Sequence, residues 1–208
     1  MKTRSGKTRP KKIKLGFLAS GRGSNMLAII DNCKAGKLAA EPVVVISNNA
    51  NAGALEYARD LGISAFHLST NTHTDPSELD DEITNTLKSH GADWLILAGY
   101  MKKIGPRLLD EFQGKILNIH PSLLPRHGGY GMYGIHVHES VLTSGDNETG
   151  VTIHLIDGEY DQGRILAQSS VRVKQDDTPE SLAARVLKVE HELYSETLRE
   201  IIEGRISL

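Results

Sequence analysis

Short apolar runs alternate regularly with helical patterns over the first 120 residues. Strands are expected at residues 13–19, 43–46, 63–68, 94–98 and 115–119, and helices at residues 25–35, 54–61 and 75–90. Parallel strands need crossover connections of this length, and the run Val-Val-Val-Ile at residues 43–46 is typical of a strand buried on both faces. The alternation therefore predicts an α/β fold, a single-domain and mostly parallel twisted sheet with helices on both faces (Rossmann-like).

The last ninety residues follow a different pattern. Strands are expected at residues 151–157 and 165–174 with a polar loop between them, which predicts a C-terminal hairpin. Thr178 suits an N-cap and Pro179 a first helical position, so a long helix should follow. The expected buried stripe of this helix is Leu182, Val186, Val189 and Leu193.

The composition excludes several classes of protein. Hydrophobic residues make up 39% and the net charge is −2, so no global field would gather nucleic acid. No run of about eighteen apolar residues is present that could span a membrane, and the N-terminus lacks the apolar core of a secretory signal. The single cysteine, Cys33, cannot form an internal disulfide, and it lies on the apolar side of an expected helix. We expect a core role for it and a reducing, cytoplasmic location.

Lys and Arg dominate the first fourteen residues, where almost nothing is apolar. An anion-binding arm and a disordered basic terminus both fit this pattern, and we favour disorder. We therefore divide the chain into a basic arm at residues 1–12 and one folded domain at residues 13–208.

A glycine-rich turn, Ser-Gly-Arg-Gly-Ser-Asn at residues 20–25, links the first strand to the first helix. Unpaired N–H groups at a helix N-terminus and glycines that allow close approach suit a phosphate. The alternative is a tight turn with Ser24 or Asn25 as N-cap, and both interpretations can hold together. No Gly-Lys-Ser/Thr follows, and Met26 replaces the third glycine of a dinucleotide fingerprint, so a small phosphorylated ligand fits better than ATP or NAD.

Asn118 and His120 lie two residues apart at the end of an expected strand that Pro121 should terminate. Side chains alternate along a strand, so these two share one face, at the carboxyl edge where open α/β sheets bind ligands. An amide beside an imidazole can polarise a carbonyl oxygen. The alternative is a structural hydrogen-bonding histidine.

The stretch "NIHPSLLP" and the later "TGVTIHLIDGEYDQGRIL" together resemble the folate-dependent formyltransferases. The resemblance extends from the glycine turn to the region of Tyr194. It implies that Asp161 joins Asn118 and His120 as a catalytic residue, which nothing in the spacing itself shows. It also implies the family's fold for residues 13–208.

Further motifs favour the glycinamide ribonucleotide branch of this family: "SGRGSN", "LAGYM", and an Ala-Arg pair separated by four residues from a Glu-His pair at residues 184–191. The methionyl-tRNA branch carries an additional C-terminal domain and the deformylase branch an N-terminal one, neither of which we expect here. The resemblance implies formyl transfer from 10-formyltetrahydrofolate to the amine of glycinamide ribonucleotide in purine biosynthesis, without a metal. His120 and Asn118 would stabilise the formyl oxygen, and Asp161 would favour the charged imidazole or relay protons through water.

The resemblance also implies the binding residues. Gly23, Ser24 and Asn25 correspond to the phosphate turn, and Glu190 to a substrate contact; a salt bridge to Arg185 or Lys188 is the alternative for Glu190. The expected folate-binding residues are Met101, Lys102, Lys103, Ile104, Asn118, Ile156, Asp157, Gly158, Glu159, Tyr160 and Asp161. Two positions depart from the family: Lys103 replaces an apolar residue, and Pro76 stands where a basic residue near the folate glutamate tail is usual. The alternatives are that His73 or the basic arm substitutes there, or that the tail binds with lower affinity.

Residues 126–134 are longer than in familiar members and hold four glycines, so we expect a mobile lid over the substrate. His136 and His138 would share one side if extended, and we interpret them as structural or substrate-facing. A formyltransferase acting on another amine or sugar nucleotide, a non-catalytic nucleotide-binding module, and an RNA-binding protein using the arm remain alternatives. A monomer and a homodimer are both compatible with the sequence.

Overall fold

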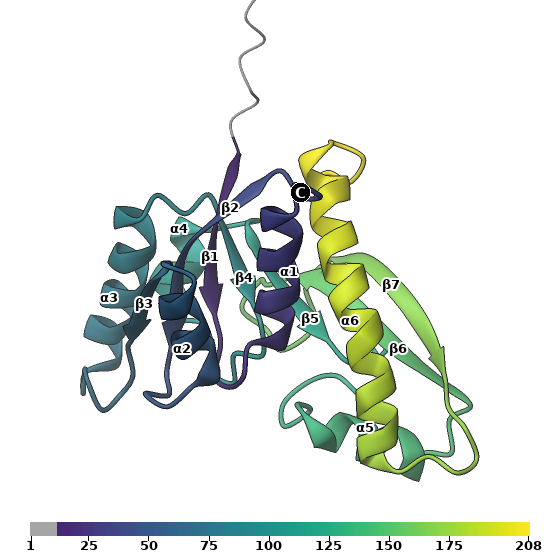
Figure 1. Ribbon diagram of the computed structural model, residues 1–208. Helices are drawn as coiled ribbons and strands as arrows, with labels where there is room; N and C mark the ends of the chain where they lie inside the picture. The colour runs from purple at the N-terminus through teal and green to yellow at the C-terminus, as the bar shows by residue number, and fades with distance from the viewer. Residues whose placement is uncertain (1–11) are drawn as a thin grey trace, which may run out of the picture.

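The computed structural model describes residues 12–208, which build one seven-stranded sheet in the order β3-β2-β1-β4-β5-β6-β7 (Figure 1). The strands are β1 (Ile13–Leu18), β2 (Ala40–Ser47), β3 (Ser64–His67), β4 (Trp94–Leu97), β5 (Ile116–His120), β6 (Glu148–Leu155) and β7 (Ile165–Arg172). The helices are α1 (Ser24–Lys34), α2 (Gly53–Asp60), α3 (Pro76–Ser89), α4 (Pro106–Glu111), α5 (Ile135–Thr143) and α6 (Pro179–Ile202). Strands β1 to β5 pair in parallel, and β6 and β7 are antiparallel to their neighbours. The predicted α/β fold class is confirmed.

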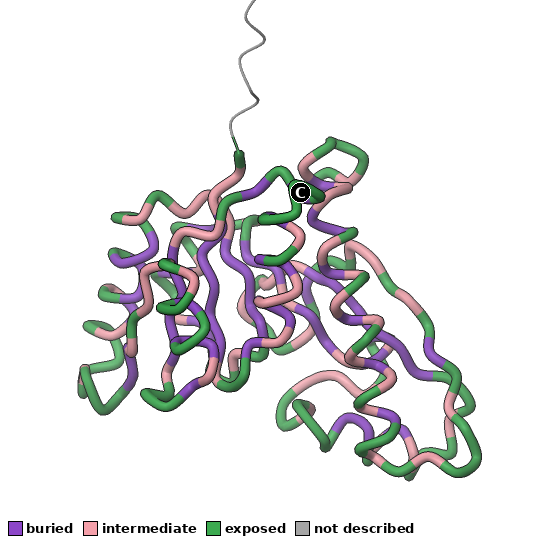
Figure 2. The backbone as a smooth tube through the Cα atoms, in the orientation of Figure 1, coloured by how far each residue is buried: buried purple, intermediate pink, exposed green. Residues whose placement is uncertain are grey.

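Helices cover both faces of this sheet. Helices α1, α2 and α6 pack on one face against a cluster that contains Phe17, and α3 and α4 pack on the other against a cluster that contains Leu18 (Figure 1). Successive residues of β1 thus enter opposite clusters, as the alternation of a strand requires. Figure 2 shows the central strands as the most continuously buried part of the backbone, with exposed positions on the outer helix surfaces and loops.

The strands expected from the sequence are all present, with ends that differ by up to three residues. Strand β2 begins earlier than expected and contains Pro42, which lacks the N–H that a ladder needs. The pairing register of β1 with β2 shifts at this point, from Leu15 opposite Pro42 to Gly16 opposite Val44. An irregularity in the ladder thus accommodates the proline.

Helix α6 begins as predicted, with Thr178 as N-cap in a reciprocal capping box with Ser181 and Pro179 in the first turn. Its predicted buried stripe is only half right. Val189 and Leu193 are half-buried, and the fully packed positions continue instead at intervals of three or four residues: Leu182, Val186, Glu190, Tyr194, Leu198 and Ile201. The stripe therefore includes a carboxylate and a phenol, which an apolar pattern does not register.

Helices α4 and α5 were not expected from the sequence. Helix α4 spans only six residues, and its first N–H groups depend on a distant partner: the Asp80 carboxylate of α3 accepts from Arg107 N at 2.8 Å and from Leu108 N at 3.3 Å. Such a cap stabilises the helix end without leaving a local signal. Helix α5 has only nine residues and directly follows the glycine-rich segment, so its apolar pattern is too short to predict a helix.

The predicted basic arm, residues 1–12, lies outside the described residues except for Lys12, so it stays a prediction. Cys33 is buried in the core as expected, and burial raises the pKa of its thiol to about 11. No helix within residues 12–208 is both long enough and apolar enough to cross a membrane.

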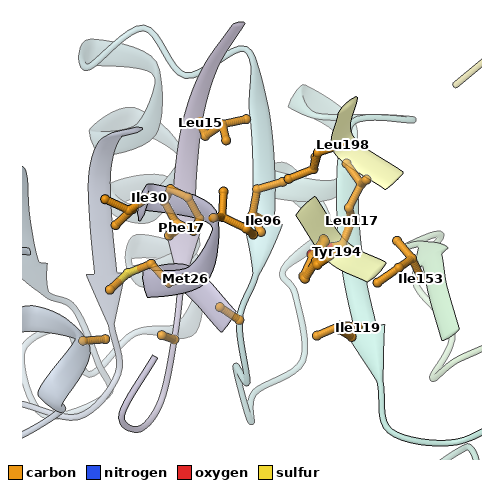
Figure 3. Close-up of a cluster of buried hydrophobic side chains, with 14 of the residues drawn as sticks. Leu15, Phe17, Met26, Ile30, Ile96, Leu117, Ile119, Ile153, Tyr194 and Leu198 are labelled. Atoms are coloured by element: carbon orange, nitrogen blue, oxygen red, sulfur yellow. The ribbon is translucent and has the colours of Figure 1, made fainter. Parts of the chain in front are cut away.

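Tyr194 connects α6 to the middle of the sheet. Its side chain is fully buried between Leu117, Ile119 and Ile153 (Figure 3). Its hydroxyl donates to the Leu117 carbonyl at 2.8 Å and also lies 3.2 Å from the Leu97 carbonyl. A buried phenol needs such a partner, because an unsatisfied hydroxyl in an apolar core is destabilising.

We predict that Tyr194→Phe lowers the free energy of unfolding by about 1–2 kcal/mol, the usual value of a buried hydrogen bond whose acceptor loses its donor. Urea denaturation followed by circular dichroism measures the change. Tyr133→Phe, at a half-exposed tyrosine, is the matched control and should leave stability unchanged. Equal stabilities of Tyr194→Phe and wild type would contradict the role given to the hydroxyl.

Candidate active site

Strand β5 carries Asn118 and His120 on one face. Leu117 and Ile119 point into the core beside Tyr194 (Figure 3), and the alternation of the strand turns Asn118 and His120 to the opposite face. His120 is the last residue of β5, and Pro121 follows outside the strand, as predicted. The two polar side chains therefore lie at the carboxyl end of a parallel strand, where the ligand edge of the sheet was expected.

The antiparallel neighbour of β5 adds a third polar group to this face. His154 of β6 lies directly opposite Asn118 in the pairing register and is fully buried. Its Nδ1 lies 3.0 Å from the Leu155 carbonyl and donates to it, so Nε2 accepts from the Asn118 amide at 3.0 Å. One N–H of Asn118 is therefore committed to His154, which fixes the amide orientation and leaves the other N–H free to donate.

The loop between β6 and β7 brings Asp161 to the same place. Its two carboxylate oxygens lie 3.5 Å from His120 Nδ1 and 3.5 Å from His154 Nε2. The residue has a left-handed backbone (φ 56°), and the Gly129 N–H donates to its carboxylate at 2.9 Å. A non-glycine residue keeps this conformation only when its surroundings hold it there. The structure therefore brings the three sequence-predicted catalytic residues together.

His120 is almost completely buried, and its ring is held at both nitrogens. Nε2 donates to the His127 carbonyl at 2.8 Å, while Nδ1 faces Asp161. Burial lowers the pKa of His120, and the Asp161 charge and the His127 carbonyl oppose this effect. Burial alone would raise the pKa of Asp161, but its contacts with His154, the charge of His120 and the Gly129 N–H outweigh it, so that pKa lies below its usual value.

His136 and His138 do not share a side, because they lie on a helix and not on an extended segment. In α5, residues two apart point in widely different directions. His136 is exposed and pairs with Glu139 at 3.0 Å, whereas His138 is buried close enough to sense the charge of His120. Burial, reinforced by His120, lowers the pKa of His138 to about 4.

The N-cap of α1 is neither Ser24 nor Asn25, the two residues that the sequence suggested. Gly23 is the N-cap, with φ 71°, and Ser24 and Asn25 are the first residues of the helix. A Cβ on Gly23 would come within 2.8 Å of the Ala54 Cβ, so both the backbone and the space require glycine. The first N–H groups of α1 thus remain free of side-chain caps, as an anion site requires.

Glu190 meets this turn from α6. Its carboxylate accepts from the Asn25 amide at 2.7 Å, so the alternative partners Arg185 and Lys188 do not pair with it; Arg185 pairs with Asp177. Burial raises the pKa of Glu190, and the Asn25 bond offsets part of that effect. Within residues 12–208, Asn25 Oδ1 has no hydrogen-bond partner. A buried carboxylate beside an unpaired amide oxygen forms a polar pair able to receive hydroxyl or N–H groups of a ligand.

The two segments expected to contact folate lie side by side. Ile104 and Ile156 pack into the same apolar cluster, and Lys103 Nζ lies 5.8 Å from the centre of the Tyr160 ring. The Met101 N–H donates to Ser20 Oγ at 2.8 Å, which ties the first segment to the glycine turn. Within this group Met101 and Tyr160 remain substantially exposed.

The departures noted in the sequence take simple structural roles. Pro76 occupies the first turn of α3 behind the Asp75 N-cap, where a missing N–H is tolerated. Lys103 contributes its charge to the face of Tyr160. Among residues 12–208, no group of three or more His, Cys, Asp or Glu side chains is placed to hold a metal ion.

Sequence reasoning missed two histidines of this site, His154 and His127. His154 stands in a run of apolar strand residues, and only its pairing opposite Asn118 gives it a role. The sequence offered no signal for this pairing, because the expected hairpin joins residues 151–157 only to residues 165–174. His127 makes contacts through both its carbonyl and its side chain, and a sequence pattern does not predict such contacts.

A partly buried amide, a buried histidine and a carboxylate at the carboxyl end of a parallel strand suit an α/β enzyme of group-transfer chemistry, and comparison with known proteins agrees. The formyl transferase family model matches residues 13–198, so the chain belongs to the formyl transferase family. The expected family is confirmed.

Relatives and solved structures point to one branch of this family. The chain is 45% identical over 199 residues to the chloroplastic phosphoribosylglycinamide formyltransferase of Arabidopsis thaliana, covering 95% of this chain and 68% of that protein. It is 37% identical over 195 residues to the phosphoribosylglycinamide formyltransferase of Haemophilus influenzae, covering 94% and 90%. The structure of glycinamide ribonucleotide transformylase 1 from Symbiobacterium toebii matches with a TM-score of 0.91 at 35% identity, covering 99% and 94%. The predicted resemblance to the glycinamide ribonucleotide branch is confirmed.

We predict that the free energy of unfolding decreases as the pH falls from about 6.5 to about 4, in part because His138 resists protonation when folded. A histidine whose folded-state pKa lies below its unfolded value binds fewer protons when folded, so its contribution to stability is lost with falling pH. His138→Gln should reduce this decrease, measured by denaturant titrations across the range. His136→Gln, which removes an exposed histidine from the same helix, should retain the wild-type decrease. Identical pH profiles for His138→Gln and wild type would refute the assignment.

Proposed function

We propose that this chain transfers the formyl group of 10-formyltetrahydrofolate to the primary amine of glycinamide ribonucleotide, giving the formylated ribonucleotide and tetrahydrofolate. The observation that carries this proposal is the cluster of Asn118, His120 and Asp161 at the carboxyl edge of the sheet. The family match and the similarity to phosphoribosylglycinamide formyltransferases support the substrate pair.

The reaction needs donors where negative charge develops. The amine nitrogen attacks the formyl carbon, and the carbonyl oxygen gains charge until the bond to the folate nitrogen breaks. The amine loses a proton in this step and the departing folate nitrogen gains one, so the proton passes from one nitrogen to the other. The free N–H of Asn118 and the Nδ1–H of a charged His120 donate to that oxygen. The His120 ring is buried and the Asn118 amide is partly buried, and both are already oriented, so little reorganisation accompanies the charge.

Asp161 has two tasks in this scheme. Its charge opposes the effect of burial on His120 and so favours the imidazolium that can donate from Nδ1. Its carboxylate, with a lowered pKa, stays ionised at neutral pH and can accept the proton that the attacking amine releases, directly or through one water. Its two oxygens face different histidines, each at 3.5 Å, so Asp161 lies between His120 and His154.

The ribonucleotide fits the turn before α1. Gly23, Ser24 and Asn25 present free N–H groups to its phosphate, and Glu190 with the unpaired Asn25 oxygen accepts from its hydroxyl or amide groups. The segments 101–104 and 156–161 receive the folate through backbone groups and through the exposed faces of Met101 and Tyr160. This division leaves the amine and the formyl group to meet over Asn118 and His120.

The cellular setting and the assembly state belong to the same proposal. We place the chain in the cytoplasm, because its single cysteine is buried and makes no disulfide. We propose a monomer or a homodimer. The lid expected at residues 126–134 also stays a proposal; the Tyr130 ring of this segment meets Tyr160 edge to face, with ring centres 5.7 Å apart, which links it to the folate side.

We predict that the wild-type chain forms tetrahydrofolate from 10-formyltetrahydrofolate only when glycinamide ribonucleotide is present. His120→Ala should lower kcat by about 10²–10³-fold, the usual loss for one oxyanion donor. Spectrophotometric assay of the folate product measures both. His136→Ala, at an exposed histidine on α5, is the control and should retain wild-type turnover. Full activity in His120→Ala would reject the mechanism, and absence of wild-type turnover would reject the substrate pair.

We predict that Glu190→Gln raises the KM for glycinamide ribonucleotide by about tenfold, the effect of losing one hydrogen bond to a charged acceptor. The KM for the folate should not change, because Glu190 lies on the ribonucleotide side beside Asn25. Initial rates with each substrate varied in turn separate the two constants. Glu196→Gln, on the exposed side of the same helix, should change neither KM. If Glu190→Gln changed only the folate KM, the assignment of Glu190 to the ribonucleotide side would be wrong.

A further inference from the structure

One short turn touches both halves of the His120–Asp161 pair. The His127 carbonyl accepts from His120 Nε2 at 2.8 Å, and two residues later the Gly129 N–H donates to Asp161 at 2.9 Å. The position of the turn formed by residues 127–129 therefore determines both the orientation of the His120 ring and the position of the Asp161 carboxylate.

The side chain of His127 anchors this turn from behind. Its Nε2 lies 2.8 Å from Asp146 Oδ2, and its Nδ1 lies 2.8 Å from Ser140 Oγ on α5. A neutral imidazole satisfies both contacts, donating from Nε2 to the carboxylate and accepting at Nδ1 from the hydroxyl. The side chains of His127 and Asp146 are about nine-tenths buried, and Arg126 also pairs with Asp146. The His127–Asp146 pair is thus largely shielded from water, which strengthens its hydrogen bond.

The imidazole is the only side chain in residues 127–129 that can hold the backbone of the turn. His127 has a left-handed backbone (φ 54°), which a residue with a side chain keeps only when other contacts hold it. Gly128 has no room for a Cβ, which would lie 2.4 Å from Leu124 Cδ2, and Gly129 has φ 99°. The imidazole is therefore the only side chain of residues 127–129, and its two hydrogen bonds hold the strained backbone in place.

We propose that His127 is a positioning residue for formyl transfer: its anchor to Asp146 and Ser140 fixes the carbonyl that holds His120 with Nδ1 turned to Asp161 and the transferring oxygen. This inference rests on the proposed function. With Nε2 committed to the His127 carbonyl, Nδ1 is the nitrogen left to donate. Without the anchor the His127 carbonyl can shift and no longer holds the His120 ring. That ring can then rotate, and its Nδ1 is no longer directed at the oxygen.

The same contact has an electrostatic consequence. A carbonyl that accepts from Nε2 favours the charged form of His120, so its loss should lower the pKa of that histidine further. The titratable groups that act on His120 are Asp161, His154, His127 and His138, and those that meet His127 are Asp146 and Arg126. Asp146→Ala leaves the His127 ring in place, so it tests the carbonyl contact without removing the direct effect of that ring on His120.

The experiment compares four variants of the full chain. His127→Phe keeps bulk but loses both anchoring bonds, Asp146→Ala removes the carboxylate that holds the imidazole, and Asp146→Asn keeps an acceptor oxygen in the same place. His136→Phe makes the same exchange at an exposed histidine outside the network. Steady-state kinetics gives kcat and both KM values, and NMR of the histidine rings gives the pH at which His120 titrates.

We expect His127→Phe and Asp146→Ala to lower kcat by about tenfold to a hundredfold, as small misplacements of a catalytic group do, with both KM values within about twofold of wild type. The His120 titration should move to lower pH in both variants. Asp146→Asn should recover most of kcat, and His136→Phe should match wild type throughout. If His127→Phe does not fold, Asp146→Ala and Asp146→Asn decide the question alone.

An unchanged kcat and an unchanged His120 titration in the anchor variants would overturn the inference. A loss of kcat with the His120 titration unmoved would also overturn it, since the effect would then be general to the fold. The titration needs no substrate, so failure of the proposed function, seen as absence of wild-type turnover, is distinguishable from failure of this inference.

Discussion

The antiparallel pairing of β5 with β6 is the constraint on which the site depends. Its register puts His154 directly opposite Asn118 and Thr152 opposite His120, so two strands distant in sequence share one polar face. A one-residue slip would turn that face into the core and expose the apolar residues Leu117 and Ile119. Burial of these neighbours therefore fixes the positions of the polar groups, and the loop that follows β6 can fold back over the face and deliver Asp161.

Burial sets up the electrostatic problem that the site then solves. A histidine inside the protein resists charging, and the pKa of His120 is lowered mainly for this reason. The Asp161 carboxylate and the His127 carbonyl act against that effect from opposite sides of the ring. Neither partner is exposed enough for water to screen it fully, so their influence on His120 is larger than at the surface. These two partners thus favour the charged, hydrogen-bond-donating form of His120 although the ring is buried.

The sequence predicts the parts of this structure that follow from local periodicity. Strand alternation placed Asn118 and His120 on one face, and the proline after them marked the end of β5 correctly. It could not predict the cap of α4 by Asp80, because that partner belongs to another helix. It placed Val189 in the buried stripe of α6 because an apolar pattern cannot register that Glu190 is buried by pairing with Asn25. The role of His154 could not be predicted either, because it depends on the pairing of β5 with β6.

The long helix α6 joins the stability of the fold to the geometry of the reaction. Glu190 and Tyr194 are four residues apart and so lie on the same side of the helix. Tyr194 donates to the carbonyl of Leu117, the residue before Asn118, while Glu190 holds Asn25 at the start of α1. One rigid helix therefore sets the distance between the turn proposed for the phosphate and the strand proposed for the chemistry. A tilt of α6 would shift the ribonucleotide side relative to Asn118 and His120, so the packing that buries Tyr194 also aligns the two halves of the site.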